Sequence, residues 1–230
     1  MNLLEKEDLI RVKADELESA GPEEIIRWAV ETFPNITFAC SFGAEDVVLV
    51  DMLQKISPST HVFYLDTDYH FKETYETRDR MSDKYGLEFV RVSPQLTVEE
   101  QAAQYGEALW NTDPNQCCAI RKVEPLTRIL SQYDAWITGI RRDQAPTRAN
   151  AKKIEYDNKF GLVKFNPIAN WTSEDVWNYI RENDVVYNPL HDRNFPSIGC
   201  EQCTRAVMPG EDPRAGRWSG SDKTECGLHK

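Results

Sequence analysis

Residues 36–53 read ITFACSFGAEDVVLVDML, and this stretch decides the fold. Its first part, Ile36 to Cys40, is a short apolar run that predicts a buried strand. A small polar loop, residues 41–46, comes next, and Val47 to Leu53 then predicts a helix. A strand, a short loop and a helix in this order are the repeating unit of an α/β fold.

The same alternation continues on both sides of this stretch. Helices are predicted over 3–20, 22–32, 71–85 and 122–132, and further strands over 61–65, 87–92 and 136–140. Strands that alternate with helices predict an α/β fold with an open, mostly parallel sheet and helices on both faces. From about residue 187, Pro, Gly and charged residues dominate. We therefore predict an α/β domain over 1–186 and a loop-rich C-terminal segment over 187–230.

Composition restricts the location and the partners of the chain. Of its 230 residues, 40% are hydrophobic, which is enough for a proper core. No apolar run reaches the roughly 20 residues of a membrane helix, and the acidic N-terminal sequence MNLLEKED does not resemble a signal peptide. These features predict a cytoplasmic protein. The net charge of −11 argues against general binding to nucleic acids or anionic membranes, so an anionic ligand needs a local basic pocket.

The loop after the first strand has the features of an anion site. Backbone N–H groups at a helix N-terminus attract negative charge, Ser41 can add a hydroxyl, and Gly43 allows close approach of the backbone. An ordinary strand-to-helix turn with Ser41 as N-cap explains the same residues equally well. Further polar clusters follow two other predicted strands, at residues 66–68 and 141–144. The carboxyl ends of parallel strands are where ligands bind in such sheets.

Four of the six cysteines form two pairs, Cys117-Cys118 and Cys200-x-x-Cys203. Because cytosolic thiols stay reduced, such pairs indicate metal binding or catalysis. Four thiolates suit zinc or an iron–sulfur cluster. Neighbouring side chains diverge, so the adjacent pair fits a cluster, which offers separate iron atoms, better than one zinc ion. The alternative is a redox dithiol at the C-x-x-C pair. Cys40, in the apolar run, is predicted to be a buried and inert thiol.

Cys226 lies near the end of the chain, in the sequence Glu225-Cys-Gly-Leu-His229. The preceding residues 219–221, Ser-Gly-Ser, predict a flexible hinge. A cysteine on such a tail can react with a bound substrate and then meet a second protein. A stray exposed thiol and a fifth metal ligand are the alternatives.

Together these motifs resemble the assimilatory adenylyl-sulfate (APS) reductases of the phosphoadenylyl-sulfate (PAPS) reductase family, within the PP-loop, adenine nucleotide α-hydrolase-like superfamily. The resemblance rests on SFGAE at 41–45, LDT at 65–67, CCxxRK at 117–122, TGxRR at 138–142, CxxCTR at 200–205, RxGRW at 214–218 and ECGLH at 225–229. ATP pyrophosphatases of this superfamily carry Ser-Gly-Gly-x-Asp-Ser in the first loop. Phe42 and Glu45 depart from that pattern, which counts against ATP hydrolysis.

The resemblance implies an oxidoreductase of sulfate assimilation and cysteine biosynthesis that reduces APS to sulfite and AMP with thioredoxin. It implies that Cys226 is the nucleophile and forms an S-sulfocysteine. It also implies a [4Fe-4S] cluster on Cys117, Cys118, Cys200 and Cys203. This cluster is expected to keep one redox state and to tune the charge of the sulfate site. Lys122, about one helical turn past Cys118, is expected near it.

The same resemblance assigns the substrate contacts. Ser41 and Gly43 are expected on the adenosine side and Leu65 near the base. Lys122, Arg148, Arg214 and Arg217 are expected on the sulfate and phosphate groups, since guanidinium forks suit these oxygens. His229 is expected to orient the thiolate or to contact substrate. Arg141 and Arg142 are expected to pair with acidic neighbours instead.

The expected partners are APS, reduced thioredoxin or glutaredoxin, and a second copy of the chain in a homo-oligomer. Three alternatives stay open. A PAPS or dual APS/PAPS reductase would use the basic stretch 148–153 for a 3′-phosphate. A PP-loop ATP pyrophosphatase would adenylate its substrate. A zinc or redox-sensing protein would use the cysteines structurally.

Overall fold

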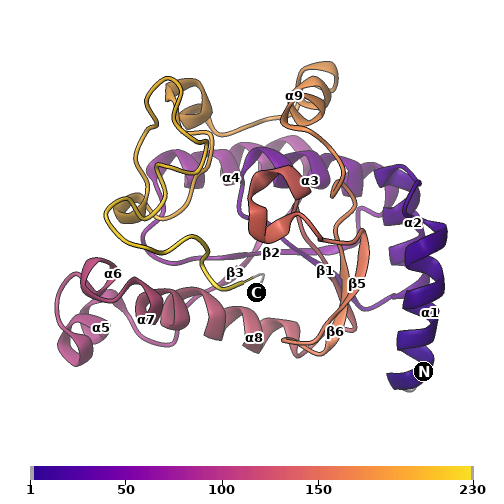
Figure 1. Cartoon of the computed structure of the whole chain (residues 1–230), viewed down its shortest axis with the longest axis horizontal. Coiled ribbons are helices and arrows are strands. Elements are labelled where there is room, and N and C mark those ends of the chain that lie inside the picture. Colours follow the sequence, from indigo (N-terminus) through magenta and orange to yellow (C-terminus); the bar gives the residue numbers. More distant parts are fainter. Residues whose placement is uncertain (1–2, 229–230) are drawn as a thin grey trace. The chain divides into compact units, whose positions relative to one another are not determined.

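The structure is a computed structural model that describes residues 3–228 (Figure 1). The chain divides into two compact units. Unit 1 comprises Met1–Phe63 and Leu130–Tyr187, and unit 2 comprises Tyr64–Ile129 and Asn188–Lys230. One passage of the chain between the units therefore falls after Tyr187, and the division into residues 1–186 and 187–230 stays a prediction.

The strands form a six-stranded sheet in the order β3-β2-β1-β4-β6-β5. Their bounds are β1 Ile36–Ala39, β2 His61–Leu65, β3 Val90–Val92, β4 Ala135–Ile137, β5 Ile154–Asp157 and β6 Leu162–Phe165. Strand β1 pairs in parallel with β2 and β4, and β4 pairs in parallel with β6. Strand β5 runs antiparallel to β6. The predicted α/β fold with a mostly parallel sheet is confirmed.

The hairpin of β5 and β6 was not predicted. Both strands are four residues long, and their burial does not alternate from residue to residue, so neither carries a strong period-two signal. The register that pairs Ile154 with Phe165 is a tertiary feature.

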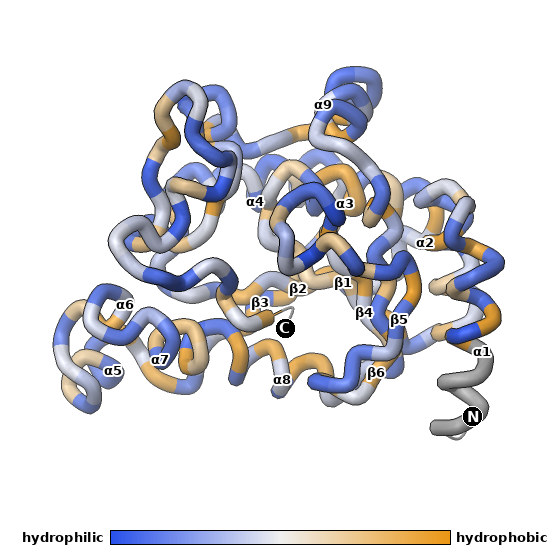
Figure 2. Tube along the Cα trace, in the orientation of Figure 1, coloured by the Kyte–Doolittle hydropathy of each residue, from blue (hydrophilic) through white to orange (hydrophobic). Residues whose placement is uncertain are grey.

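Unit 1 contains the helices α1 Leu3–Glu16, α2 Pro22–Thr32, α3 Ala44–Ile56 and α9 Ser173–Glu182. Helix α3 is buried without a break from Asp46 to Leu53, and its tube is mostly orange in Figure 2. A helix with a continuous buried run of mostly apolar residues belongs in the interior. Helix α3 thus fixes the loop before it to the core.

Unit 2 contains α4 Lys72–Tyr85, α5 Val98–Tyr105, α6 Leu109–Thr112 and α7 Pro114–Cys118. A π-helical turn, Ala119–Val123, joins α7 to α8 Glu124–Leu130. We predicted one helix over 122–132. Pro125 has no N–H for the carbonyl of Arg121, which is consistent with the wider turn just before it.

The described part of the chain from Asn188 on has only short 3₁₀ helices, Pro189–Arg193 and Glu201–Cys203. No helix of the described residues is long and apolar enough to cross a membrane.

Candidate active site

Unit 1 holds the loop that we predicted as an anion site. Phe42 adopts a φ of 61°, in the left-handed region that favours glycine, and its side chain is only 2% exposed. A non-glycine residue there costs on the order of 1 kcal/mol or more. Burial of the phenyl ring offsets that cost, which explains how a phenylalanine occupies a glycine position of the PP-loop pattern.

The N-cap of α3 is Gly43, not Ser41, so the N-cap interpretation of Ser41 is wrong. Ser41 donates instead to Asp46, whose Oδ2 lies 2.6 Å from both the backbone nitrogen and the Oγ of Ser41. Burial raises the pKa of Asp46 from 3.8 to about 6, although the bonds from Ser41 lower it. The loop is therefore held in shape by a buried carboxyl group.

The cluster after β4 meets this loop. Arg141 donates to Glu45 Oε1 at 3.0 Å through Nε, and it also pairs with Asp143. Arg142 pairs with Glu18 at 2.6 Å. The expectation that these two arginines pair with acidic neighbours is confirmed. Arg148 is half-buried and donates to the side-chain oxygen of Gln144 at 2.6 Å.

Unit 2 holds the four paired cysteines and Cys226. Cys117 and Cys118 end α7, Cys200 is the N-cap of the 3₁₀ turn Glu201–Cys203, and Cys203 is the last residue of that turn. All four line one pocket together with Tyr69, Trp110, Pro114, Arg121, Lys122, Arg217 and Trp218. The structure thus brings two segments together that lie about eighty residues apart in the sequence.

None of the six cysteines is in a disulfide. Burial, followed by the charge of Cys118, raises the pKa of Cys117 to about 12, and burial with the charge of Cys200 raises that of Cys203 to about 11. Burial acts to lower the pKa of Lys122, but the negative charge of Cys200 and Cys226 raises it above its usual value. The charge of the neighbouring thiols thus favours the protonated form of Lys122, whereas burial and the adjacent thiols disfavour the thiolate form of Cys117 and Cys203.

Among the described residues, no group of three or more His, Cys, Asp or Glu side chains converges closely enough to hold one metal ion. A cluster has different requirements, because its ligands bind separate iron atoms and need not meet at one point. Four free thiols around one pocket, with three cationic side chains on its wall, fit an anionic thiolate-bound group.

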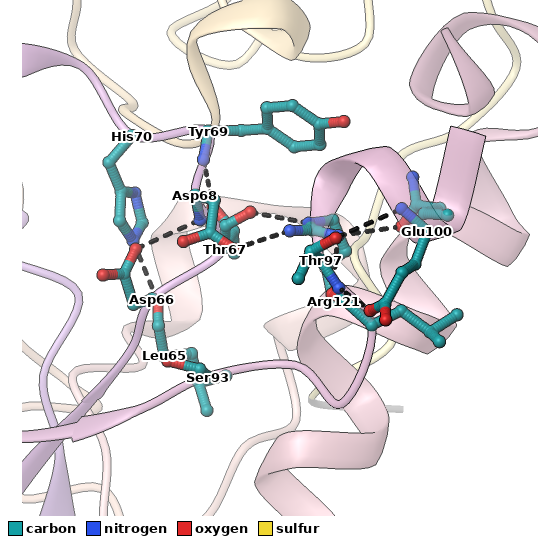
Figure 3. Close-up of polar contacts among 12 residues, drawn as sticks. Leu65, Asp66, Thr67, Asp68, Tyr69, His70, Ser93, Thr97, Glu100 and Arg121 are labelled. Carbon is teal, nitrogen blue, oxygen red and sulfur yellow. Dashed lines mark hydrogen bonds and ion pairs between the residues drawn. The ribbon is translucent and has the colours of Figure 1, made fainter. Parts of the chain in front are cut away.

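Arg121, three residues after Cys118, contacts the segment that follows β2 (Figure 3). Its guanidinium is almost fully buried and donates to the carbonyl of Thr67 at 2.6 Å and to Asp68 Oδ2 at 2.7 Å. It also lies over the ring of Tyr69, 4.9 Å from its centroid. The segment that contains Thr67 also contacts the second cysteine pair, because Thr67 Oγ1 lies 3.4 Å from Cys200 Sγ.

Two further predicted residues, Arg214 and Arg217, lie in unit 2. Arg217 donates to Ser197 Oγ at 3.1 Å, and its guanidinium lies 4.5 Å from the ring centroid of Trp218. Arg214 donates to the carbonyl of Thr224 at 3.0 Å and to Glu225 Oε2 at 3.3 Å. Arginine thus lies both at the cysteine pocket and at the tail that carries Cys226.

Cys226 is half-buried, and the next residue, Gly227, packs against Val123, which follows Lys122 of the cysteine pocket. Leu65 is half-buried, and its carbonyl bonds to His70 Nε2 at 2.9 Å. His229 lies outside the described residues. Unit 1 therefore holds Ser41, Gly43 and Arg148, and unit 2 holds the other described members of the predicted site.

Sequence reasoning missed several residues that shape these sites. They are Asp46, Thr67, Arg121 and Glu225. Each stands directly within or beside a motif already quoted, and that proximity was the available signal. As predicted, Cys40 is buried, and burial raises the pKa of its thiol well above the usual value.

Known proteins resemble this chain over most of its length. Residues 35–206 match the family described as phosphoadenosine phosphosulfate reductase domain. A protein of Lysinibacillus sphaericus named adenosine 5′-phosphosulfate reductase is 50% identical, over 98% of this chain and 97% of its own. Adenosine 5′-phosphosulfate reductase 1 of Bacillus subtilis is 47% identical, over 91% of each chain.

Solved structures agree on the fold. The phosphoadenylyl-sulfate (PAPS) reductase of Candida auris is 33% identical with a TM-score of 0.74, over 84% of this chain and 96% of that one. FMN adenylyltransferase of Candida glabrata has a TM-score of 0.59, over 85% of this chain and 66% of its own. At 17% sequence identity, this likeness concerns only the fold. The family match covers residues 35–206, and a relative over nearly the whole chain is 50% identical in sequence. This chain therefore belongs to the phosphoadenosine phosphosulfate reductase family.

Proposed function

We propose that this chain is an adenylyl-sulfate reductase, which reduces APS to sulfite and AMP with electrons from reduced thioredoxin or glutaredoxin. Two relatives, 50% and 47% identical to this chain, are named adenosine 5′-phosphosulfate reductase. The observation that carries the proposal is that Gly227, which follows Cys226, packs against Val123, which follows Lys122 at the pocket of four further thiols. The reaction belongs to sulfate assimilation and cysteine biosynthesis, in the reducing cytoplasm that six free thiols suit.

In the first step, the thiolate of Cys226 attacks the sulfur of APS. An S–S bond forms, the S–O bond to the phosphate breaks, and AMP leaves with the electron pair. The product is S-sulfocysteine. In the second step, a thiolate of thioredoxin attacks Cys226 Sγ, sulfite leaves with the S–S electron pair, and a second thioredoxin thiol resolves the mixed disulfide.

Cationic side chains have two functions in the first step. Lys122 belongs to the π-helical turn against which the residue after Cys226 packs, and a cation near a reacting cysteine favours attack by its thiolate. Together with Arg148, Arg214 and Arg217 it would bind the sulfate and phosphate oxygens. Ser41 and Gly43 would hold the adenosine side, Leu65 the base, and His229 the thiolate or the substrate.

We further propose that Cys117, Cys118, Cys200 and Cys203 hold a [4Fe-4S] cluster. The donor set fits, because four free thiols and three cationic side chains line the same pocket. When bound, the cluster would supply fixed negative charge beside the sulfate site rather than electrons. Lys122 and Arg217 would offset that charge and orient the substrate.

The nucleophile is tested with Cys226→Ser. Wild-type protein mixed with APS and no thioredoxin should gain one sulfonate on Cys226, seen by mass spectrometry of the C-terminal peptide. The variant should bind APS as tightly as wild type and gain none. Full turnover by Cys226→Ser would rule out this function for the residue.

The metal is tested on protein purified without oxygen. Iron and acid-labile sulfide in equal amounts, about four of each per chain, should be present in wild type and lost in Cys200→Ser. The matched control is Cys40→Ser, which changes a buried thiol of the other unit. Stoichiometric zinc without sulfide would instead support a structural metal.

PAPS is the second candidate substrate, because the Candida auris structure is that of a PAPS reductase. Turnover of APS and PAPS at equal concentration separates the two activities. Release of pyrophosphate from ATP would instead support the ATP pyrophosphatase alternative. A homo-oligomer stays a prediction, which the molar mass in solution tests.

A further inference from the structure

The chain around Cys226 packs against the elements that carry the paired cysteines. At one end, Trp218 is buried, and its N–H donates to the carbonyl of Cys203 at 2.9 Å. At the other end, Gly227 lies so close to Val123 that an added Cβ would be 3.6 Å from Val123 Cγ2. Val123 belongs to the same π-helical turn as Lys122. Residues 218–227, which we call the docked tail, are therefore held at both ends.

An ion pair holds the docked tail next to Cys226. Glu225 stands directly before Cys226, and its side chain is 5% exposed. Its Oε2 accepts from Arg214 Nη2 at 3.3 Å, and the same nitrogen donates to the carbonyl of Thr224 at 3.0 Å. A carboxylate loses hydration when it is buried and stays charged only with a partner. The pair therefore fixes both the backbone and the side chain next to Cys226.

A second contact ties the docked tail to α7. Lys223 Nζ donates to Asn115 Oδ1 at 2.6 Å and lies 5.7 Å from the ring centroid of Trp218. Asn115 is two residues before Cys117 in the same helix. This contact is more exposed than the ion pair, so we expect it to contribute less.

We propose that Glu225 is a positioning residue that, through its ion pair with Arg214, holds Cys226 at the cysteine pocket for attack on the substrate. This inference rests on the proposed function of Cys226. Glu225 does not touch the reacting atoms in this assignment, and it acts by restricting the backbone that carries the nucleophile. Loss of the pair lowers the fraction of chains in which Cys226 is placed to react.

Glu225→Gln removes the charge and keeps the size of the side chain, and Glu225→Asp keeps the charge. The matched control is Glu211→Gln, which breaks another carboxylate–arginine pair of the C-terminal segment, the exposed pair with Arg205. Arg214→Gln breaks the same pair from the other side and serves if Glu225→Gln does not fold.

The first measurement follows the tail without catalysis. Limited trypsin digestion of the full chain cuts after Lys223 only when the docked tail opens, and mass spectrometry counts that cut. We expect cleavage about tenfold faster in Glu225→Gln and Arg214→Gln, because a buried hydrogen bond to a charged group is lost. Glu211→Gln should match wild type, and Glu225→Asp should restore most of the protection.

The second measurement compares two rates. One is the single-turnover rate at which APS sulfonates Cys226, and the other is the rate at which thioredoxin releases sulfite from the sulfonated protein. We expect Glu225→Gln to slow the first step about tenfold, leave the second unchanged, and be rescued by Glu225→Asp. Unchanged cleavage and sulfonation in Glu225→Gln would overturn the inference alone. Absence of sulfonation in wild type would overturn the proposed function, and the inference with it.

Discussion

The carboxyl group of Asp46 accepts hydrogen bonds from both the backbone N–H and the hydroxyl of Ser41, each at 2.6 Å. Asp46 is buried, whereas Ser41 is exposed. A buried carboxyl group thus determines the shape of the loop that we propose binds the adenosine side of the substrate. Because this carboxyl group titrates, the stability of the loop should depend on pH.

Asp46 should make the protein less stable as the pH rises through the weakly acidic range. Burial raises its pKa from 3.8 to about 6, so the folded state binds the proton more tightly than the unfolded chain. Its stabilising contribution is complete below pH 3.8 and is lost as the pH rises through about 6. The full change corresponds to about 3 kcal/mol.

Urea unfolding of wild type and Asp46→Asn between pH 4 and pH 7 measures this effect. The free energy of unfolding of wild type, relative to the variant, should fall as the pH rises. Other titrating groups cancel in the comparison. Parallel curves would show that Asp46 has an ordinary pKa.

Gly139→Ala should distort the same loop. A Cβ at this position would lie 2.2 Å from Asp46 Oδ1 and 3.0 Å from the Cβ of Glu45, so the carboxyl group has to move. Overpacking of this kind costs about 1–3 kcal/mol. We expect a lower melting temperature and weaker binding of AMP by calorimetry. Gly21→Ala, whose nearest neighbour would be a glutamate oxygen at 3.8 Å, is the control that should change neither.

Arg121→Met should destabilise unit 2 by about 3–5 kcal/mol, since it leaves the partners of a buried guanidinium without their donor. Arg121 donates to Thr67, Gln101 and Asp68, and Thr67 in turn contacts Cys200. Both cysteine segments should therefore lose order, and the iron and sulfide of the proposed cluster should fall together. Thermal unfolding of metal-free protein and metal analysis measure the two effects.

Arg128→Met is the control for this change. Arg128 is exposed and pairs with Glu124 one helical turn away. Its loss should cost less than about 1 kcal/mol and leave the metal content unchanged. If both substitutions lowered the stability and the metal content equally, Arg121 would not stabilise the two cysteine segments as predicted.

Gly199→Ala should weaken substrate binding without unfolding the protein. An added Cβ would lie 2.3 Å from Arg217 Nη2, which is the flexible end of a side chain and can move away. Moving the guanidinium disturbs its contacts with Ser197 and Trp218 and shifts a predicted anion ligand. We expect KM for APS to rise about tenfold, which corresponds to one charged hydrogen bond, with the melting temperature almost unchanged. An unaltered KM would remove Arg217 from the anion site.

The sequence by itself determined the α/β class, because the apolar run of β1, the polar loop and the apolar helix α3 are local patterns. It also identified the cysteine pairs, whose spacing is legible without a structure, and the pairing of Arg141 and Arg142 with acidic side chains.

Only the tertiary structure decided which distant residues meet. The pocket that joins Cys117 to Cys200, the bond from Thr67 to Cys200 and the ion pair of Arg214 with Glu225 all depend on how segments pack. No local period encodes such contacts, because their energy comes from burial and charge pairing between parts of the chain far apart in sequence or in irregular loops. For the same reason the edge hairpin of β5 and β6, which is set by register, escaped prediction.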